Sequence, residues 1–191
     1  MRKIYILLSR TGTLPSRMIH LSLGGLYTHA SIAITPETNK LYSFARRTLH
    51  NPLNAGFMLE NTKTHVFAMH QKCNCAVYSI EISDDAYANI EKVLKRFVAN
   101  PKRFGYNFLG VIPSRLGIPW NRKHHFTCSQ FVAYVLHVSG GVKLPKEYSL
   151  MMPNDFLDIV GMKLVYSGKI RDCKIEKEDE NVDISSVSEQ V

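Results

Sequence analysis

The sequence predicts an α+β fold in which helices pack against an antiparallel sheet. Short apolar segments rich in β-branched residues fill the first 82 residues, and two helical patterns follow them. No repeat and no Pro/Gly-rich linker divides the chain. Strands followed by helices favour one sheet covered by helices rather than alternating βαβ units. With 191 residues, 45% of them hydrophobic, the chain is long enough for one core.

The strands are predicted from short apolar runs bounded by turn residues. The run IYILL predicts a strand over residues 2–8, and the turn PETN joins two strands into a hairpin over 27–35 and 40–46. Further strands are expected over 56–61, 64–69 and 73–82. Residues 13–25 instead have apolar side chains near helical spacing between Pro15-Ser16 and Gly24-Gly25, which predicts a short helix.

Two longer helices follow. Ser83 is a favourable N-cap, Asp84 and Asp85 suit a first turn, and Pro101 ends the segment. After a loop-rich stretch over 105–120, an apolar face at helical spacing begins near Cys128 and stops at Gly140-Gly141.

Charge separates the chain into two parts. The net charge is +8, yet residues 174–191 hold two Lys against six Asp or Glu and no aromatic residue. We therefore expect a folded domain over 1–173 and an acidic, disordered tail over 174–191. The basic body is expected to be a solvated face, with an anionic partner such as a lipid headgroup, nucleic acid or an acidic substrate as the alternative. No recognition-helix pattern supports a nucleic-acid partner.

The cellular compartment is inferred from cysteine usage and hydropathy. Four cysteines in a chain of this size do not form a disulfide scaffold, and no segment approaches the roughly 20 apolar residues of a membrane span. The N-terminal apolar run is also too short for a secretory signal. The sequence predicts a cytoplasmic protein.

Cys128 is the candidate nucleophile. Thr127, Cys128 and Ser129 occupy the first turn of the predicted helix, where unpaired N–H groups and the helix dipole favour negative charge. A thiolate there has a lowered pKa and is the reactive form. The alternative is a buried structural thiol.

A histidine is needed to take the thiol proton. His29 lies in the predicted strand YTHASIAIT and shares a face with the small residues Ser31 and Ala33, which leaves room for a substrate or a packed helix. His124 and His125 are closer in sequence but lie in a loop that does not fix their orientation. We therefore prefer His29 as general base and acid.

The segments THASIAI and FTCSQFVAYVL, in that order, resemble the circularly permuted branch of the NlpC-type, papain-like cysteine hydrolases, the YiiX/YebB-like proteins related to lecithin:retinol acyltransferase. The resemblance covers roughly residues 1–165. It implies a papain-like fold, Cys128 as nucleophile and His29 as base. Tyr106, in the segment GYNF, resembles a tyrosine-rich segment that precedes the cysteine in this family.

The resemblance does not supply a third catalytic residue. Family members often carry a Glu on the strand after the histidine strand, but here that strand is KLYSFARR. Ser43 is its nearest polar residue. Glu60 could enter from the next segment, although a solvated loop position is the simpler expectation.

The predicted function is a thiol hydrolase or acyltransferase that acts on an amide or ester bond of a small-molecule, lipid or peptide substrate. Thr127, Ser129 and Tyr106 would line the oxyanion site or cleft, and no cofactor is expected. His65, His70, Cys73 and Cys75 lack the usual zinc spacing, so no metal is expected and the two cysteines are placed on one strand face. The alternative function is a non-catalytic binding module on the same fold that docks on an anionic lipid surface or a protein partner.

Overall fold

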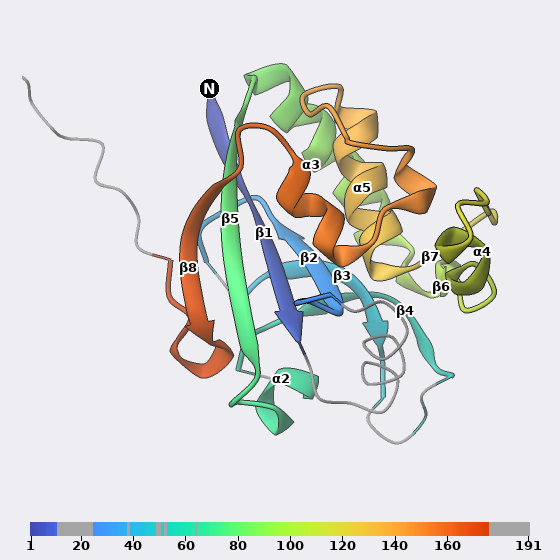
Figure 1. Ribbon diagram of the computed structural model, residues 1–191, viewed down its shortest axis with the longest axis horizontal. Coiled ribbons are helices and arrows are strands. Elements are labelled where there is room, and N and C mark those ends of the chain that lie inside the picture. Colours follow the sequence, from blue (N-terminus) through green and yellow to red (C-terminus); the bar gives the residue numbers. More distant parts are fainter. Residues whose placement is uncertain (11–24, 38, 49–50, 52, 64, 176–191) are drawn as a thin grey trace, which may run out of the picture.

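The computed structural model describes residues 1–10, 25–37, 39–48, 51, 53–63 and 65–175 (Figure 1). The helix predicted over 13–25 lies outside the described residues, Gly25 excepted. The predicted tail lies outside them as well, apart from Lys174 and Ile175, and Ile175 packs against a core cluster.

Over the described ranges, eight strands form one sheet in the order β7-β6-β4-β3-β2-β1-β5-β8. Their bounds are β1 Arg2–Arg10, β2 His29–Ala33, β3 Leu41–Arg46, β4 Ala55–Glu60, β5 Asn74–Ile82, β6 Gly105–Tyr106, β7 His125–Phe126 and β8 Lys163–Lys169. The β2–β3 hairpin is confirmed, with Ile32 opposite Tyr42. The predicted all-antiparallel sheet is wrong at one edge, because β6 and β7 pair in parallel. The long connection between these two strands makes a parallel pairing possible.

In the part of the chain that the structure describes, four helices accompany the sheet: α2 His65–Met69, α3 Asp84–Ala99, α4 Val111–Arg115 and α5 Cys128–Ser139. Short 3₁₀ turns are η1 Pro101–Arg103, η2 Tyr148–Leu150, η3 Pro153–Asp158 and η4 Ile170–Asp172. The capping prediction for α3 is confirmed, because the Ser83 side chain accepts a hydrogen bond from the Ala86 N–H at 3.2 Å. α5 ends at Gly140, whose φ of 72° is left-handed.

Three expectations about local structure are corrected. Residues 65–69 form α2 rather than a strand, because one helical turn buries Phe67 among residues of the second core cluster. The loop-rich stretch 105–120 contains β6 and α4. Cys73 precedes β5, so only Cys75 belongs to that strand.

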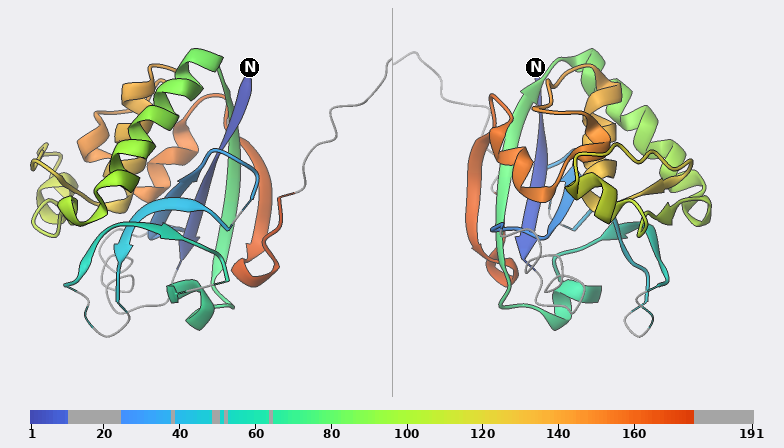
Figure 2. Two further views of the ribbon diagram at one scale, coloured as in Figure 1. Left: turned by 180° about the vertical axis from the view of Figure 1, so that it is seen from behind. Right: turned by 45° about the vertical axis from the view of Figure 1, so that its right-hand side comes forward.

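Two core clusters lie on opposite faces of the sheet. The larger cluster joins β1–β4 to α3 and α5, which lie side by side (Figures 1 and 2). Phe131 of α5 is fully buried there, with its ring centroid 5.0 Å from those of both Phe44 and Phe97. The smaller cluster contains Phe67 and Val77. Within the described residues, no helix is both long enough and apolar enough to cross a bilayer.

Candidate active site

Cys128 is the first residue of α5, and its position is fixed by the helix cap. The Thr127 hydroxyl accepts a hydrogen bond from the Gln130 N–H at 3.2 Å, and the Gln130 side-chain oxygen accepts one from the Thr127 N–H at 3.0 Å. This capping box satisfies two backbone donors that a helix start leaves open. The Cys128 side chain is buried, with the residue only 5% exposed.

His29 is the first residue of β2, and its ring contacts side chains from β3 and β4. Its Nε2 lies 2.8 Å from Glu60 Oε2 at the end of β4 and 3.2 Å from Ser43 Oγ on β3. Glu60 is only 4% exposed, so the expected solvated loop position is wrong. The register between β3 and β4 places Glu60 opposite Leu41, on the buried part of the sheet.

His29 and Cys128 are brought together as a hydrogen-bonded pair. Burial alone would lower the pKa of His29, but the charge of Glu60 and hydrogen bonds to Cys128 and Glu60 outweigh it, so the pKa lies well above its usual 6.5. Burial would likewise raise the pKa of Cys128. The hydrogen bond and charge of His29, together with the Ala30 and Ser129 N–H groups, lower it below 9.0 instead. The arrangement favours a thiolate beside an imidazolium.

The two nitrogens of His29 therefore face different partners. Nε2 contacts Glu60 and Ser43. That leaves Nδ1 as the nitrogen available for the thiol proton, and Glu60 as the group that orients the ring.

Tyr106 of β6 places its hydroxyl beside Cys128. Burial, followed by the charge of Cys128 and a hydrogen bond to its side chain, raises the pKa of Tyr106 well above 10.0. A hydrogen bond from the Cys128 backbone N–H opposes this rise. The neutral phenol can donate a hydrogen bond, and its oxygen accepts one from the backbone N–H at the start of α5.

A buried amide pair holds β6 against α5. Asn107 Nδ2 donates to Gln130 Oε1 at 3.2 Å, and Gln130 Nε2 donates to the Ser149 carbonyl at 2.7 Å. Asn107 is fully buried and Gln130 is 3% exposed. Sequence reasoning did not identify either residue. A signal for Gln130 was present, because Thr127 followed three residues later by Gln is a capping-box pattern.

A small cavity of about 30 Å³ reaches Cys128. Its walls include Tyr106, Thr127 and Ser129, as the sequence predicted for the cleft, and also Thr28, Met151 and Met152. Ser31 and Ala33, which were expected to leave room near His29, are buried, and Ala33 packs in the same cluster as Phe67 of α2.

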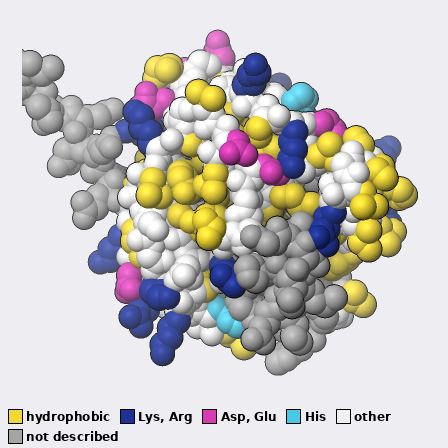
Figure 3. All heavy atoms as spheres, viewed as in Figure 1, with side chains coloured by type: hydrophobic (Ala, Val, Ile, Leu, Met, Phe, Trp, Pro, Cys, Tyr) yellow, Lys and Arg dark blue, Asp and Glu magenta, His cyan; other side chains and the backbone are white. Residues whose placement is uncertain are grey.

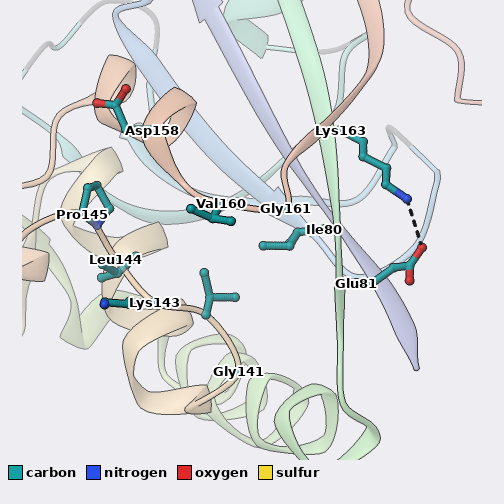
Figure 4. Close-up of a pocket in the computed structure, with 11 residues that line it drawn as sticks. Ile80, Glu81, Gly141, Lys143, Leu144, Pro145, Asp158, Val160, Gly161 and Lys163 are labelled. Atoms are coloured by element: carbon teal, nitrogen blue, oxygen red, sulfur yellow. Dashed lines mark ion pairs between the residues drawn. The ribbon is translucent and has the colours of Figure 1, made fainter.

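A larger hollow of about 460 Å³ lies elsewhere, between Ile80 and the segments around Gly141 and Val160 (Figure 4). Gly141 follows α5, so this hollow lies about 18 Å along the helix from Cys128. An ion pair of 3.7 Å between Lys163 and Glu81 lies at its rim. No residue predicted for catalysis lines it.

The remaining histidine candidates are engaged away from the thiol. Nδ1 of His125 lies 2.8 Å from the Lys123 carbonyl oxygen, and His124 Nε2 accepts from Arg103 Nε at 3.3 Å. Among the described residues, no three His, Cys, Asp or Glu side chains gather in a way that could hold a metal ion.

The fold and site define an α+β protein with a mixed eight-stranded sheet and a buried Cys-His-Glu arrangement. Comparisons with protein-family models, curated proteins and solved structures give no match. The functional argument therefore depends on the site itself.

Proposed function

We propose that the protein is a cysteine-dependent hydrolase or acyltransferase that cleaves an amide or ester bond through a thioester. The observation that carries this proposal is the arrangement Cys128–His29–Glu60, with 2.8 Å between His29 and Glu60. In it the pKa of the His29 imidazole is raised and the pKa of the Cys128 thiol is lowered. These two pKa shifts favour a Cys128 thiolate, the nucleophile, and a His29 imidazolium, the proton donor, at the same pH.

In the proposed reaction, the Cys128 thiolate attacks the carbonyl carbon and the carbonyl electrons move to oxygen. The Cys128 N–H and the Tyr106 hydroxyl stabilise the oxyanion. When the intermediate collapses, the C–N or C–O bond breaks and the imidazolium of His29 donates its proton to the leaving group. Water or another acceptor then attacks the thioester, loses its proton to His29 and releases the Cys128 thiolate.

A circularly permuted, NlpC-type, papain-like fold is part of the same proposal. The histidine on β2 precedes the cysteine helix in the chain, which is the order of that branch. The candidate orienting carboxylate comes from β4 rather than from β3, the strand after the histidine strand. Ser43 of β3 adds a second contact to the same nitrogen.

The proposed substrate is a small molecule, lipid or peptide with an amide or ester bond. The cavity of about 30 Å³ at the thiol is too small for a whole substrate of these kinds, so it would accept only the reacting group. Cytoplasmic location is also proposed, since a reducing compartment keeps a catalytic thiol reactive.

The test compares the reactivity of the cysteines. Iodoacetamide at pH 7 should label Cys128 faster than Cys73, Cys75 or Cys173, and His29→Ala should slow that labelling. A thiol-directed acyl probe should modify the wild-type protein and Cys73→Ala but not Cys128→Ala. Equal labelling of all four cysteines, unaffected by His29→Ala, would instead support the non-catalytic binding module.

A further inference from the structure

Next to the candidate site, the chain exposes a cluster of large apolar side chains. We call residues 108–120, which include α4, the apolar lobe. Six of its side chains are between 44% and 71% exposed: Phe108, Leu109, Ile112, Leu116, Ile118 and Trp120. Figure 3 shows hydrophobic side chains gathered on the side of the molecule where Figure 1 places α4. Contiguous exposed apolar side chains of this kind mark an interaction surface.

The apolar lobe has an ordered internal framework. Asn107 Oδ1 accepts from the Gly110 N–H at 3.1 Å, and Asn107 Nδ2 donates to the Trp120 carbonyl at 3.3 Å, so one buried side chain ties both ends together. The Ser114 hydroxyl is within 2.7 Å of the Gly110 carbonyl and 3.1 Å of the Ser149 carbonyl. These bonds fix the backbone, so the exposed apolar side chains are displayed from a defined surface.

The chain around the apolar lobe is rich in cations, and one carboxylate borders it, that of Glu147, whose Oε1 accepts from Asn121 Nδ2 at 3.3 Å. The chain contains no Asp or Glu from Lys92 through Lys146. The exposed cations nearest the lobe in sequence are Lys102, Arg103, Arg115, Arg122 and Lys123. Arg122 and Lys123 also line a hollow of about 310 Å³ together with His124 and His125. A phosphate-sized anion is complementary to such a hollow.

We propose that the apolar lobe docks on an anionic lipid bilayer. Its large side chains enter the interfacial region, and the flanking cations bind headgroup phosphates. Apolar insertion combined with electrostatic attraction is the usual basis of reversible membrane binding. A protein partner would satisfy the apolar side chains equally well, but the excess of cations over carboxylates beside the lobe favours a surface of uniform negative charge.

Docking in this orientation brings the bilayer to the candidate site. Val111 and Ser114 belong to the apolar lobe and also line the cavity at Cys128. A lipid held at the lobe therefore lies beside the thiol. The docking itself does not depend on catalysis and would hold for a protein whose Cys128 is inert.

Trp120 makes the proposal directly measurable, because it is the single tryptophan of the chain and is 45% exposed. On vesicles of phosphatidylcholine with about 30% phosphatidylglycerol, its emission should shift to the blue, and lipids brominated on the acyl chain should quench it. Co-sedimentation with these vesicles should exceed that with pure phosphatidylcholine by about ten-fold and should weaken as salt is added.

Two kinds of variant distinguish insertion of the apolar side chains from electrostatic attraction to the lipid headgroups. Ile112→Ser/Leu116→Ser should reduce vesicle binding by about ten-fold or more, since it removes apolar side chains that would be buried. The matched control Val160→Ser/Leu164→Ser changes exposed apolar residues near the opposite edge of the sheet and should bind as the wild type does. Arg122→Glu/Lys123→Glu should lower binding to anionic vesicles, whereas Lys174→Glu, after β8, should have little effect.

Two results would overturn the proposal. One is an unchanged Trp120 emission together with no sedimentation on anionic vesicles at low salt. The other is a dimer in sedimentation velocity that Ile112→Ser/Leu116→Ser converts to a monomer, which would assign the apolar lobe to a second copy of the chain. Circular dichroism of each variant checks that a loss of binding is not a loss of folding.

Discussion

Glu60 Oε2 lies 2.8 Å from His29 Nε2, although 31 residues separate them in the chain and they belong to strands that are not neighbours. β3 lies between β2 and β4, and its Ser43 hydroxyl contacts the same nitrogen at 3.2 Å. A buried carboxylate stabilises the charged form of a buried imidazole that it contacts, because the ionised pair adds the attraction of opposite charges to the hydrogen bond. This contact is therefore the basis for the first prediction.

Glu60→Gln should make the thiolate form of Cys128 less stable relative to the thiol. The amide keeps a hydrogen-bonding group near His29 but removes the charge that raises its pKa. A less readily charged imidazole stabilises the thiolate less, and alkylation by iodoacetamide at pH 7 should slow roughly ten-fold, the effect of one unit in the thiol pKa. Glu37→Gln, on an exposed turn, is the matched control and should react at the wild-type rate. Equal rates for the two variants would show that Glu60 does not act on the thiol.

The same substitution should lower stability in a way that depends on pH. The folded-state pKa of His29 is raised, so its charged form stabilises the folded protein fully below pH 6.5, and this contribution is lost as the pH rises through the folded-state pKa. Urea unfolding should therefore show a larger difference between the wild-type protein and Glu60→Gln at pH 6 than at alkaline pH. We expect roughly 1–3 kcal/mol at the lower pH, where a charged hydrogen bond is lost. A difference that does not change with pH would contradict the ionised pair.

Titration of the thiol should give a midpoint below 9.0 in the wild-type protein. The far-ultraviolet absorbance of the thiolate, taken as the difference between wild type and Cys128→Ala, measures it directly. In His29→Gln the midpoint should rise above 9.0, because the hydrogen bond and charge that lower the thiol pKa are lost and the effect of burial, which raises it, remains. His125→Gln, whose ring contacts the Lys123 carbonyl instead, should leave the midpoint unchanged. A wild-type midpoint at or above 9.0 would leave Cys128 as a buried structural thiol.

Tyr106→Phe should separate thiol reactivity from acyl transfer. The hydroxyl hydrogen-bonds with the side chain and the backbone N–H of Cys128, but it is not among the groups that lower the pKa of the thiol. Alkylation by iodoacetamide should therefore change little, whereas acylation by a thiol-directed ester probe should slow by roughly one hundred-fold. Tyr134→Phe, at a half-buried position of α5 that packs against Phe126 and Tyr148, serves as the control. If both reactions slowed equally, Tyr106 would act on the thiol rather than on the oxyanion.

The parts of this fold that the sequence predicts depend on local signals. Ser83 caps α3 as a short polar residue before an apolar stripe, and the left-handed Gly140 ends α5, whereas Thr127, expected in the first turn of α5, is its N-cap. The β2–β3 hairpin follows from its turn. His29 and Cys128 were singled out by their residue types and by these local elements, and the structure brings them together.

The parts that were missed depend on contacts between distant segments. Glu60 is buried because the β3–β4 register carries it inward, and nothing in the segment GFMLEN indicates that register. Phe67 fits either a strand or a helix until the opposite face of the sheet provides its site. Strand β8 is mostly exposed and is held by its pairing with β5. Because neither face of β8 is buried along its length, its sequence has no alternation of apolar and polar residues that would predict a strand.

The buried amides of Asn107 and Gln130 carry the last prediction, because they connect the strand bearing Tyr106 to the helix bearing Cys128. Asn107→Ala and Gln130→Ala should each destabilise the protein by roughly 1–3 kcal/mol, since each leaves buried polar groups without their partner.

The two losses should not add, because the side chains share the 3.2 Å bond between them. A double-mutant cycle by urea unfolding should give a coupling energy of roughly 0.5–3 kcal/mol. Gln71→Ala, outside this amide pair, controls for the loss of an amide and should combine additively with Asn107→Ala. Additivity in the Asn107–Gln130 cycle as well would mean that β6 is held in place by its pairing with β4 and β7 alone, and that the alignment of Tyr106 with the thiol does not depend on the amides.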